Sequence, residues 1–233
     1  MNSLLHLDSS HSGDSLSRQL TALFARRWRR LSGTEGYRYR NLATHPVPTV
    51  GPVYCSFAQK VERHGTVSHE TVDALARSTA ERREWTLTRP LITELLKADV
   101  VLIGAPMYNF TIPASLKGWI DRITFPGAFT GADSGEPLLR GTRVVVVTTR
   151  GGGYGPGTPR ERFDFQTPYL RAYFGGLGIA EEDLYFVHTE MTRAGDVPEL
   201  HRFQEMAALS RARAESLMAA LPEQLAARPA QIR

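Results

Sequence analysis

The amino-acid sequence predicts an α/β fold, a doubly wound five-stranded parallel sheet with helices on both faces. First, short apolar runs alternate with longer segments whose apolar residues recur three and four positions apart. Second, the strongest runs, at 100–104 and 143–149, are nearly continuously apolar, with four successive valines in the second, which is typical of strands buried on both faces. Third, 233 residues suit one domain with a large core. We therefore expect a single domain over 1–233 with the strand order 2-1-3-4-5.

The first part of the chain predicts two strands with a helix between them. Residues 3–7 form a short apolar run, and 15–31 carry leucine and aromatic residues at helical spacing. Residues 37–42 alternate weakly, which favours a strand at the edge of the sheet. Three prolines within 45–52 exclude regular structure there, and 54–86 is expected to be helical and irregular.

The middle of the chain predicts the centre of the sheet. A helix is expected over 88–97, directly before the buried strand at 100–104. The loop that ends this strand leads into a second helix over 114–123. Several glycines and prolines in 126–141 predict a loop or hairpin-like excursion, after which the valine-rich run 143–149 forms the fourth strand.

The last part of the chain predicts one more strand and two helices. A glycine-rich loop at 151–159 precedes a helix that runs through 170–177. The last strand is expected at 184–188 and a long helix over 197–221. Pro222 should end this helix, so that 222–233 form a loosely ordered tail.

Composition and charge exclude several classes of function. The net charge is +4, but the arginines are scattered between apolar positions at helical spacing, so we expect solvated helix faces and no nucleic-acid surface. Cys55 is the only cysteine and the histidines are scattered, so neither a disulfide framework nor a metal site is expected. The first residues do not resemble a signal peptide, and no apolar run is long enough to span a membrane, so we expect a cytoplasmic protein.

Three loops at the carboxyl ends of predicted strands carry the candidate chemistry, because ligands bind there in parallel sheets. Residues 105–113 combine aromatic and amide groups, which suit a planar heteroaromatic ring with polar edges. Residues 8–18 lead into a helix N-terminus, and such a terminus can bind phosphate through its free N–H groups. From this loop alone, a role of Ser15 as a simple helix cap is equally favoured. Residues 149–159 are glycine-rich but lack the spacing of a dinucleotide-binding loop or a P-loop.

The segment 105–121 closely resembles the flavin-contacting loop of the FMN-dependent NADH:azoreductases, a flavodoxin-like family of quinone and azo-dye reductases. It matches the family patterns P-M-Y-N-F-x-I-P and L-K-x-W/Y-x-D without a gap, and 149–152 match S/T-R-G-G. The resemblance runs from the first strand to roughly residue 190. It implies a flavodoxin-like fold, bound FMN, and NADH or NADPH as co-substrate.

The resemblance also implies which residues bind FMN. In the family the first loop holds the phosphate, the second lies against the isoalloxazine, and the third touches the pyrimidine edge of the ring. The matching positions are Ser10, Ser15, Leu16 (backbone) and Ser17 for the first loop, Met107, Tyr108, Asn109 and Phe110 for the second, and Thr149, Arg150, Gly151 and Gly152 for the third.

The acceptor pocket is expected to be lined by Phe129 and Tyr154. The family often carries T-F-x-Y-T-E-N-G where this chain has A-F-T-G-A-D-S-G at 128–135, so a tyrosine of the usual pattern is missing. The resemblance further implies a homodimer with two FMN, in which the partner chain roofs each pocket. The irregular segment 45–67 is the candidate for that roof.

The resemblance implies an FMN-dependent NAD(P)H oxidoreductase that reduces quinones and azo compounds by two-electron, ping-pong hydride transfer. NADH reduces N5 of FMN and leaves, and the acceptor then enters the same pocket. No side chain need act as an acid or base, because FMN carries the chemistry. The alternative is a flavodoxin-type electron carrier, against which the basic charge argues, since such carriers are generally acidic and meet basic partners.

Residues 13–17, Gly-Asp-Ser-Leu-Ser, leave a second alternative open, because they match the signature of GDSL esterases, with Ser15 as nucleophile. Such a hydrolase needs a histidine base, an orienting aspartate and an oxyanion hole. Those families supply them through a late D-x-x-H and a central G-x-N-D, and this chain has neither at those places. Five residues also separate Leu7 from Gly13, whereas the esterase signature directly follows its strand.

Overall fold

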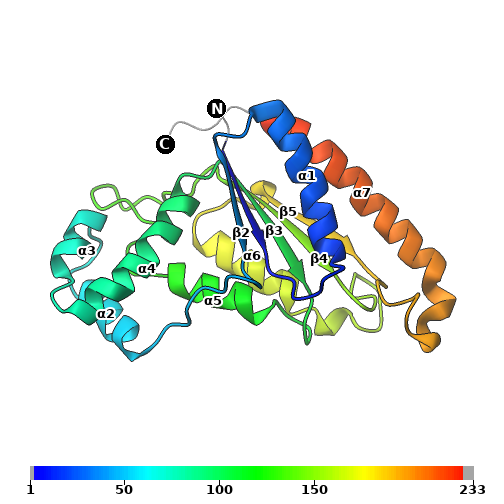
Figure 1. The fold of residues 1–233 in the computed structure, drawn as a ribbon, viewed down its shortest axis with the longest axis horizontal. Coiled ribbons are helices and arrows are strands. Elements are labelled where there is room, and N and C mark those ends of the chain that lie inside the picture. Colours follow the sequence, from blue (N-terminus) through cyan, green and yellow to red (C-terminus); the bar gives the residue numbers. More distant parts are fainter. Residues whose placement is uncertain (1–2, 228–233) are drawn as a thin grey trace.

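The computed structural model describes residues 3–227 and contains one parallel sheet (Figure 1). Its strands lie in the order β2-β1-β3-β4-β5, so the predicted order 2-1-3-4-5 is confirmed. Adjacent strands pair in parallel throughout, so the chain crosses over between each pair of neighbouring strands. The strands are β1 (Leu4–Asp8), β2 (Tyr37–Asn41), β3 (Val100–Pro106), β4 (Arg143–Thr149) and β5 (Leu184–Thr189).

Two long helices, α1 (Leu16–Ser32) and α7 (Gln204–Ala227), lie side by side over one face of the sheet (Figure 1). Their apolar sides meet side chains from β3 and β4 in one buried cluster, to which Phe24 and Met218 contribute. Because both helices run antiparallel to the strands, their N-termini lie near the carboxyl edge of the sheet. This arrangement brings the start of α1 close to the loops that follow the strands.

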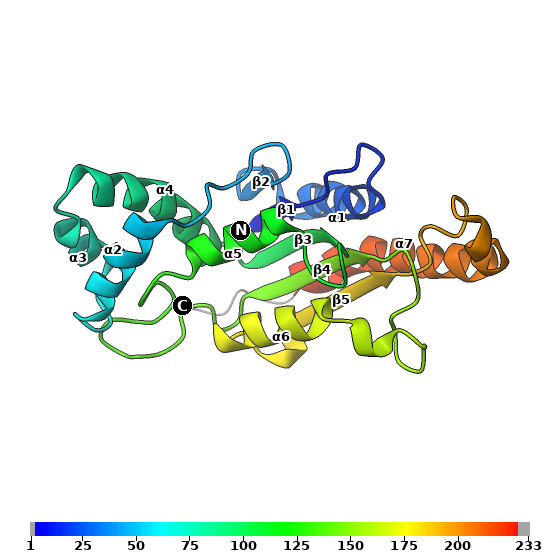
Figure 2. The same cartoon turned by 90° about the horizontal axis from the view of Figure 1, so that it is seen from below.

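The other face is covered by α4 (Thr79–Leu96), α5 (Ala114–Ile123) and α6 (Gln166–Gly176). The shorter helices α2 (Pro52–Glu62) and α3 (His69–Leu75) pack beside α4 and extend this layer into a lobe beyond the sheet (Figures 1 and 2). Three short 3-10 helices complete the described chain: η1 (Glu161–Phe163), η2 (Glu181–Asp183) and η3 (Pro198–Phe203).

The helix expected over 88–97 begins nine residues earlier than predicted. The side chain of Ser78 accepts a hydrogen bond from the N–H of Glu81, and the Glu81 carboxylate accepts one from the N–H of Ser78. This capping box was present in the sequence as Ser-x-x-Glu and marks the true start. Pro90 lies inside the helix, and the apolar contacts of Leu91, Ile92 and neighbouring residues hold the chain helical through it.

The prediction that Pro222 ends the last helix was wrong for the described part of the tail. α7 continues to Ala227, because Leu221, Pro222 and Leu225 are buried against the sheet layer and α1. Tertiary packing thus outweighs the lost backbone hydrogen bond. The same helix begins at Gln204, after η3, and not at 197. Residues 228–233 of the predicted tail lie outside the described part of the chain.

Candidate functional site

A cavity of about 750 Å³ opens at the carboxyl edge of the sheet, where the loops after β1, β3 and β4 meet. This is the edge at which parallel sheets bind ligands, and the volume is in the range of small-molecule sites. Most of the residues predicted to bind FMN line it. They are Ser10, Ser15, Leu16, Met107, Tyr108, Asn109, Thr149 and Gly151.

The first loop delivers hydroxyl groups and the N-terminus of α1 to one end of the cavity. Ser15 is the N-cap residue, and its hydroxyl accepts a hydrogen bond from the N–H of Arg18 (3.2 Å). The hydroxyls of Ser15 and Ser17 lie 2.9 Å apart, and Ser10 accepts a bond from the N–H of Ser12 (3.3 Å). Ser15 therefore caps the helix and lines the cavity at the same time. The positive end of the helix dipole and these hydroxyls suit a phosphate.

The second loop contains a tight turn in a rarely adopted conformation. Tyr108 and Thr111 exchange two backbone hydrogen bonds, of 3.0 and 3.1 Å. The two residues between them have positive φ angles, 47° at Asn109 and 71° at Phe110. Asparagine adopts this region readily, but a bulky aromatic residue there is strained by about 1–3 kcal/mol. The strain turns Asn109 into the cavity and Phe110 out of it.

Phe110 joins an aromatic group beside the cavity and does not line it. Its ring lies 5.5 Å from that of Phe163 and 6.3 Å from that of Tyr154, measured between centroids. Its carbonyl accepts a hydrogen bond from the N–H of Phe165 (3.1 Å), which ties the turn to the segment before α6. Phe110 is 43% exposed, whereas Tyr154 is buried. The two residues predicted for different parts of the site are therefore neighbours at its rim.

The third loop is joined to the second by a hydrogen bond from the N–H of Met107 to the carbonyl of Thr149 (2.9 Å). Gly151 lies at the cavity wall, and a Cβ atom there would come within 3.0 Å of Cδ of Arg193. Gly152 is buried, and a Cβ atom there would come within 3.1 Å of Nη1 of Arg160. At both positions a side chain from a later loop therefore packs directly on the backbone, which a residue larger than glycine would displace.

The side chain of Arg150 does not line the cavity, and its buried guanidinium belongs to an ion cluster. Its guanidinium donates to the hydroxyl of Thr167 (2.6 Å) and pairs with the carboxylates of Asp164 (3.0 Å) and Glu190 (3.5 Å). Burial raises the pKa of Asp164, but hydrogen bonds from Thr167 and the charge of Arg150 outweigh this and lower it below its ordinary value. Arg150 therefore anchors the third loop to the segment before α6.

Six of the predicted site residues do not line the cavity. Phe129 belongs to the excursion at 126–141 and is buried in the apolar core, and its carbonyl accepts a hydrogen bond from the N–H of Leu138 (2.8 Å). The others lie one residue behind the wall or at the rim. The six are Ser17, Phe110, Phe129, Arg150, Gly152 and Tyr154.

The cavity also has lining residues that the sequence analysis did not select. They come from the first loop and the first turn of α1, from the end of β3, from the loop after β5, and from the first third of α7. The fourth loop was open to prediction, because β5 ends at the same edge of the sheet as β1, β3 and β4. The additional residues are Ser12, Asp14, Gln19, Pro106, Thr192, Arg193 and Arg211.

The surroundings of Ser15 do not form a hydrolase site. Within residues 3–227, its hydroxyl contacts the N–H of Arg18 and the hydroxyl of Ser17, and no histidine bonds to it. A serine nucleophile needs a histidine within hydrogen-bond reach and a group that orients this base. His11 lies in the same loop, but its ring faces Tyr108, 6.4 Å away between centroids. The esterase alternative therefore lacks its geometry.

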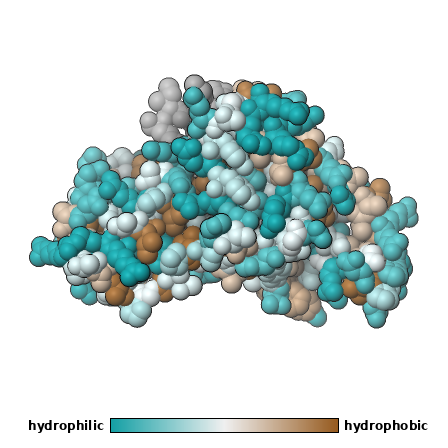
Figure 3. All heavy atoms as spheres, in the orientation of Figure 1, coloured by the Kyte–Doolittle hydropathy of each residue, from teal (hydrophilic) through white to brown (hydrophobic). Residues whose placement is uncertain are grey.

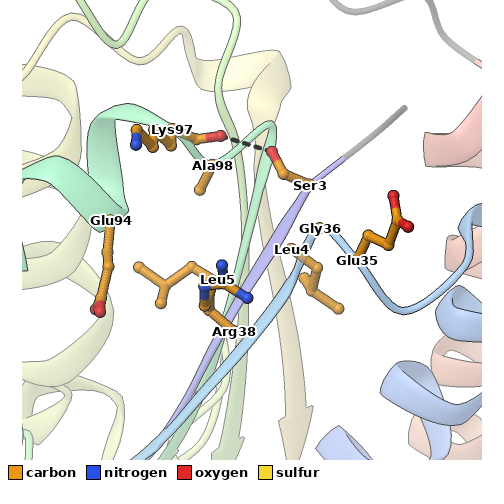
Figure 4. A pocket seen from close by; sticks show the side chains of 9 residues that line it. All are labelled: Ser3, Leu4, Leu5, Glu35, Gly36, Arg38, Glu94, Lys97 and Ala98. Carbon is orange, nitrogen blue, oxygen red and sulfur yellow. Dashed lines mark hydrogen bonds between the residues drawn. The ribbon is translucent and has the colours of Figure 1, made fainter.

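A smaller hollow of about 170 Å³ lies at the opposite end of the strands (Figure 4). It is lined by the starts of β1 and β2 and by the end of α4, where the hydroxyl of Ser3 donates to the carbonyl of Lys97 (2.6 Å). Its volume is too small for a flavin, and the amino edge of a parallel sheet is not where ligands bind in such folds. The candidate site is the larger cavity.

The larger cavity fits FMN on three counts. Its volume accommodates a ligand of that size. One end offers serine hydroxyls and a helix N-terminus for a dianionic phosphate. The other end offers the side chains of Met107, Tyr108 and Asn109 together with the backbone of Gly151, which suit a flat ring with polar edges. Within residues 3–227 no cluster of histidine, cysteine and acidic side chains could hold a metal ion.

Several known proteins are similar to this chain. A family model described as a flavodoxin-like fold matches residues 2–212. An FMN-dependent NADH:quinone oxidoreductase of Nocardia farcinica is 41% identical over 200 residues, covering 86% of this chain and 88% of that protein. One of Streptomyces coelicolor with the same name is 39% identical over 219 residues, covering 93% and 91%.

Solved structures agree with the fold. The crystal structure of an FMN-dependent NADH-azoreductase from Bacillus anthracis in complex with FMN superposes with a TM-score of 0.72 and 22% identity, covering 95% of this chain and 100% of that one. An azoreductase from the same species superposes with a TM-score of 0.73 and 18% identity. At these identities the likeness establishes the shared fold.

Proposed function

The chain belongs to the flavodoxin-like family of FMN-dependent NADH:quinone oxidoreductases, and from its structure we propose how its site works. The protein is an FMN-dependent enzyme that oxidises NADH and reduces quinones and azo compounds. The single observation that carries this function is the cavity at the carboxyl edge of the sheet. It joins a phosphate-binding helix N-terminus to an aromatic and amide loop of the right size for a flavin.

The phosphate end of the site is held by the first loop. The hydroxyls of Ser10 and Ser15 and the N–H groups of Leu16 and Ser17 would donate to the phosphate oxygens. Ser17 contributes through its backbone and through the bond of its hydroxyl to Ser15, since its side chain is buried behind the wall. The negative charge is further stabilised by the dipole of α1.

The ring end of the site is formed by the second and third loops. Met107, Tyr108 and Asn109 would lie against the ring, and Phe110 would close the rim and exclude water. Thr149 and Gly151 would face the polar edge of the ring through backbone groups. Neither Arg150 nor Gly152 lines the cavity, and both fix the position of this loop from behind its wall.

FMN, when bound, supplies the two-electron chemistry that links NADH to a quinone. The chain's own residues bind and orient the cofactor, and none is required as an acid or base. One cavity must then serve both substrates in turn, which gives ping-pong kinetics. Steady-state rates at several fixed quinone concentrations test this, because double-reciprocal plots against NADH should be parallel. Intersecting lines would contradict a shared pocket.

The enzyme acts as a homodimer in which the partner chain roofs the pocket. Support comes from apolar side chains that stay exposed on the lobe, with Val53 of α2 at 38% and Leu87 of α4 at 37%. Hydrophobic side chains also gather left of centre on the face in Figure 3, where α2, α4 and α5 lie. Val53 falls in the segment 45–67, the expected roof. Sedimentation analysis should give twice the chain mass of 25.9 kDa, and a monomer would contradict the proposal.

Phe129 and Tyr154 enter the acceptor pocket differently. Tyr154 lies beside Phe110 at the rim, where it can meet an acceptor that reaches the cavity of its own chain. Phe129 is buried in the core, so it can shape the pocket only through the excursion at 126–141, which would have to reach a partner's cavity. Tyr154→Ala should therefore raise KM for quinone more than Phe129→Leu does.

No helix among residues 3–227 is long and apolar enough to cross a membrane. We place the enzyme in the cytoplasm, where its electron donor NADH is available. Fractionation of the producing cells tests this location, because the protein should remain with the cytoplasmic fraction and not with the periplasmic or membrane fraction.

The deciding experiment is an absorbance spectrum of the purified protein, recorded without oxygen before and after addition of NADH. Flavin bands that NADH bleaches and a quinone restores support the reductase. Flavin bands that do not respond to NADH would favour the flavodoxin-type electron carrier. No flavin binding, even after incubation with FMN, would overturn the proposed function.

A further inference from the structure

Arg193, in the loop after β5, is placed as a cation at the ring end of the cavity. Arg193 lines the cavity. A Cβ atom on Gly151 would come within 3.2 Å of its Cγ atom and within 3.0 Å of its Cδ atom. The aliphatic part of the side chain thus packs on the glycine backbone. This contact places the side chain of Arg193 at the third loop, which is separated from the first loop by β3.

The guanidinium of Arg193 is also without an ion-pair partner among residues 3–227. The other arginines around the cavity are engaged. Arg211 pairs with Glu215 (2.8 Å), Arg18 donates to the carbonyl of Ser10 (2.8 Å), and Arg150 is held by the half-buried carboxylates of Asp164 and Glu190. Arg193 is therefore the cavity-lining arginine of the described chain whose charge is not already balanced by a neighbour.

We infer that Arg193 sets the reduction potential of the bound flavin, an inference that rests on the proposed function. Reduction adds negative charge to the ring of FMN, and a fixed cation beside the polar edge of the ring stabilises that charge. A charge-assisted hydrogen bond from a guanidinium is stronger than one from a neutral donor. The protein's contribution to cofactor chemistry lies in such tuning charges. Arg193 thereby makes the reduced form of the enzyme easier to reach with NADH.

The position of Arg193 argues against a phosphate contact. The phosphate end is built from the loop after β1, whereas Arg193 packs on the loop after β4, two strands away in the sheet. Neighbouring strands lie about 4.8 Å apart, so two strand spacings separate the two ends by roughly 10 Å. Arg211 lines the cavity from α7, which packs beside α1, and is the better candidate for the phosphate side.

The chain offers a matched control. Arg160 is likewise exposed and without an ion-pair partner in the described chain, and its Nη1 lies 3.1 Å from where a Cβ atom on Gly152 would be. Unlike Arg193, it does not line the cavity. Arg160→Gln therefore removes the same charge from the neighbouring glycine without removing a cation that faces the flavin.

The test is the midpoint potential of FMN bound to wild type, Arg193→Gln and Arg160→Gln, measured by equilibrium reduction against a reference dye. Arg193→Gln should weaken the preference for the reduced flavin about tenfold, which lowers the potential by about 30 mV for a two-electron couple. Arg193→Lys should recover part of the shift, because it keeps a cation. Arg160→Gln should leave the potential close to that of wild type.

Dissociation constants for FMN and riboflavin, from flavin fluorescence, separate the alternatives. If Arg193→Gln weakens FMN but not riboflavin and leaves the potential unchanged, Arg193 contacts the phosphate and the inference is overturned. Equal shifts of the potential in Arg193→Gln and Arg160→Gln would also overturn it, because general surface charge would then suffice. Failure of the wild type to bind FMN would instead overturn the proposed function.

Discussion

The hydroxyl of Tyr108 accepts a hydrogen bond from the backbone N–H of His11, at 3.1 Å. Tyr108 belongs to the loop after β3 and His11 to the loop after β1, so the bond joins the proposed ring end of the site to the proposed phosphate end. The two ends of an elongated ligand must be recognised at a fixed separation. This contact helps to set it, together with the bond from the hydroxyl of Ser115 to the carbonyl of Ser9 (3.2 Å).

We predict that Tyr108→Phe weakens FMN binding while the fold is kept. The substitution removes the acceptor for His11 and keeps the aromatic ring against the cavity. A neutral hydrogen bond contributes about 0.5–1.5 kcal/mol, so the dissociation constant for FMN should rise by up to about tenfold. Titration of the apoprotein with FMN, followed by quenching of flavin fluorescence, gives this constant.

Tyr169→Phe is the matched control for that experiment. Tyr169 lies on α6, and its ring stacks on Tyr173 with 6.4 Å between centroids, away from the cavity. Removal of the Tyr169 hydroxyl should leave the dissociation constant for FMN unchanged. Similar constants for Tyr108→Phe and wild type would show that the first and second loops hold their separation without the bond to His11.

The turn at Asn109 and Phe110 yields a second prediction, about stability. Phe110→Ala and Phe110→Gly both lose the contact with Phe163, but only glycine relieves the positive φ of 71°. The glycine variant should therefore be more stable than the alanine variant by about 1 kcal/mol, in spite of the greater freedom of glycine in the unfolded chain. Urea unfolding of the two variants measures the difference.

The opposite order, with alanine more stable than glycine, would mean that the strain at Phe110 is absent in solution. A parallel comparison at Thr111, which has no positive φ, serves as the control. There the alanine variant should be at least as stable as the glycine variant, because no strain offsets the entropy cost of glycine.

Much of this fold and part of its site followed from the sequence for definite physical reasons. Continuous apolar runs identify buried parallel strands, and the glycine and aromatic loops after them identify the binding edge. The conformation of Phe110 could not be predicted, because no local signal announces a positive φ in a bulky residue. The ion pairs that hold the side chain of Arg150 away from the cavity could not be predicted either, because the partners Asp164 and Glu190 are distant in the sequence.

The cavity-lining residues of the loop after β5 could have been predicted from the position of that strand, although they belong to no known motif. Thr192 and Arg193 match no pattern, yet they follow a strand that ends at the binding edge. The start of α4 was missed for a similar reason, because the Ser78 and Glu81 capping pair lies in a segment without clear apolar periodicity. Topology, once the strand order is known, supplies such residues.

A third prediction concerns the close approach of β1 and β3 next to the site. A Cβ atom on Gly104 would come within 2.5 Å of Oδ1 of Asp8. That carboxylate is buried and accepts hydrogen bonds from Thr21 (2.9 Å) and Tyr39 (3.0 Å). Gly104→Ala must displace it, and overpacking of this kind costs about 1–3 kcal/mol. Thermal unfolding should show a clearly lowered Tm.

Gly195→Ala is the control for Gly104→Ala, since a Cβ atom there meets nothing within 4 Å and its φ is not positive. Its Tm should stay close to that of wild type. An unchanged Tm for Gly104→Ala would show that β1 can shift away from β3 without loss of the Asp8 hydrogen bonds.

A fourth prediction concerns pH and His188, whose Nδ1 lies 2.7 Å from the hydroxyl of Thr148. Burial, and then the charge of Arg150, lower the pKa of His188 from 6.5 to about 4. Between these two values the unfolded chain binds a proton that the folded chain does not, so stability falls as pH falls from 6.5 to 4. The loss is about 3 kcal/mol over that window, at about 1.4 kcal/mol per pKa unit.

His188→Gln should remove this part of the pH dependence, because glutamine can still contact Thr148 but does not titrate. The free energy of unfolding, from urea titrations at pH 7 and pH 4.5, should fall more in wild type than in the variant by about 2–3 kcal/mol. His201→Gln, at an exposed position in η3, is the control and should keep the wild-type dependence. Equal losses in wild type and His188→Gln would show that burial does not lower the pKa of His188 in the folded protein.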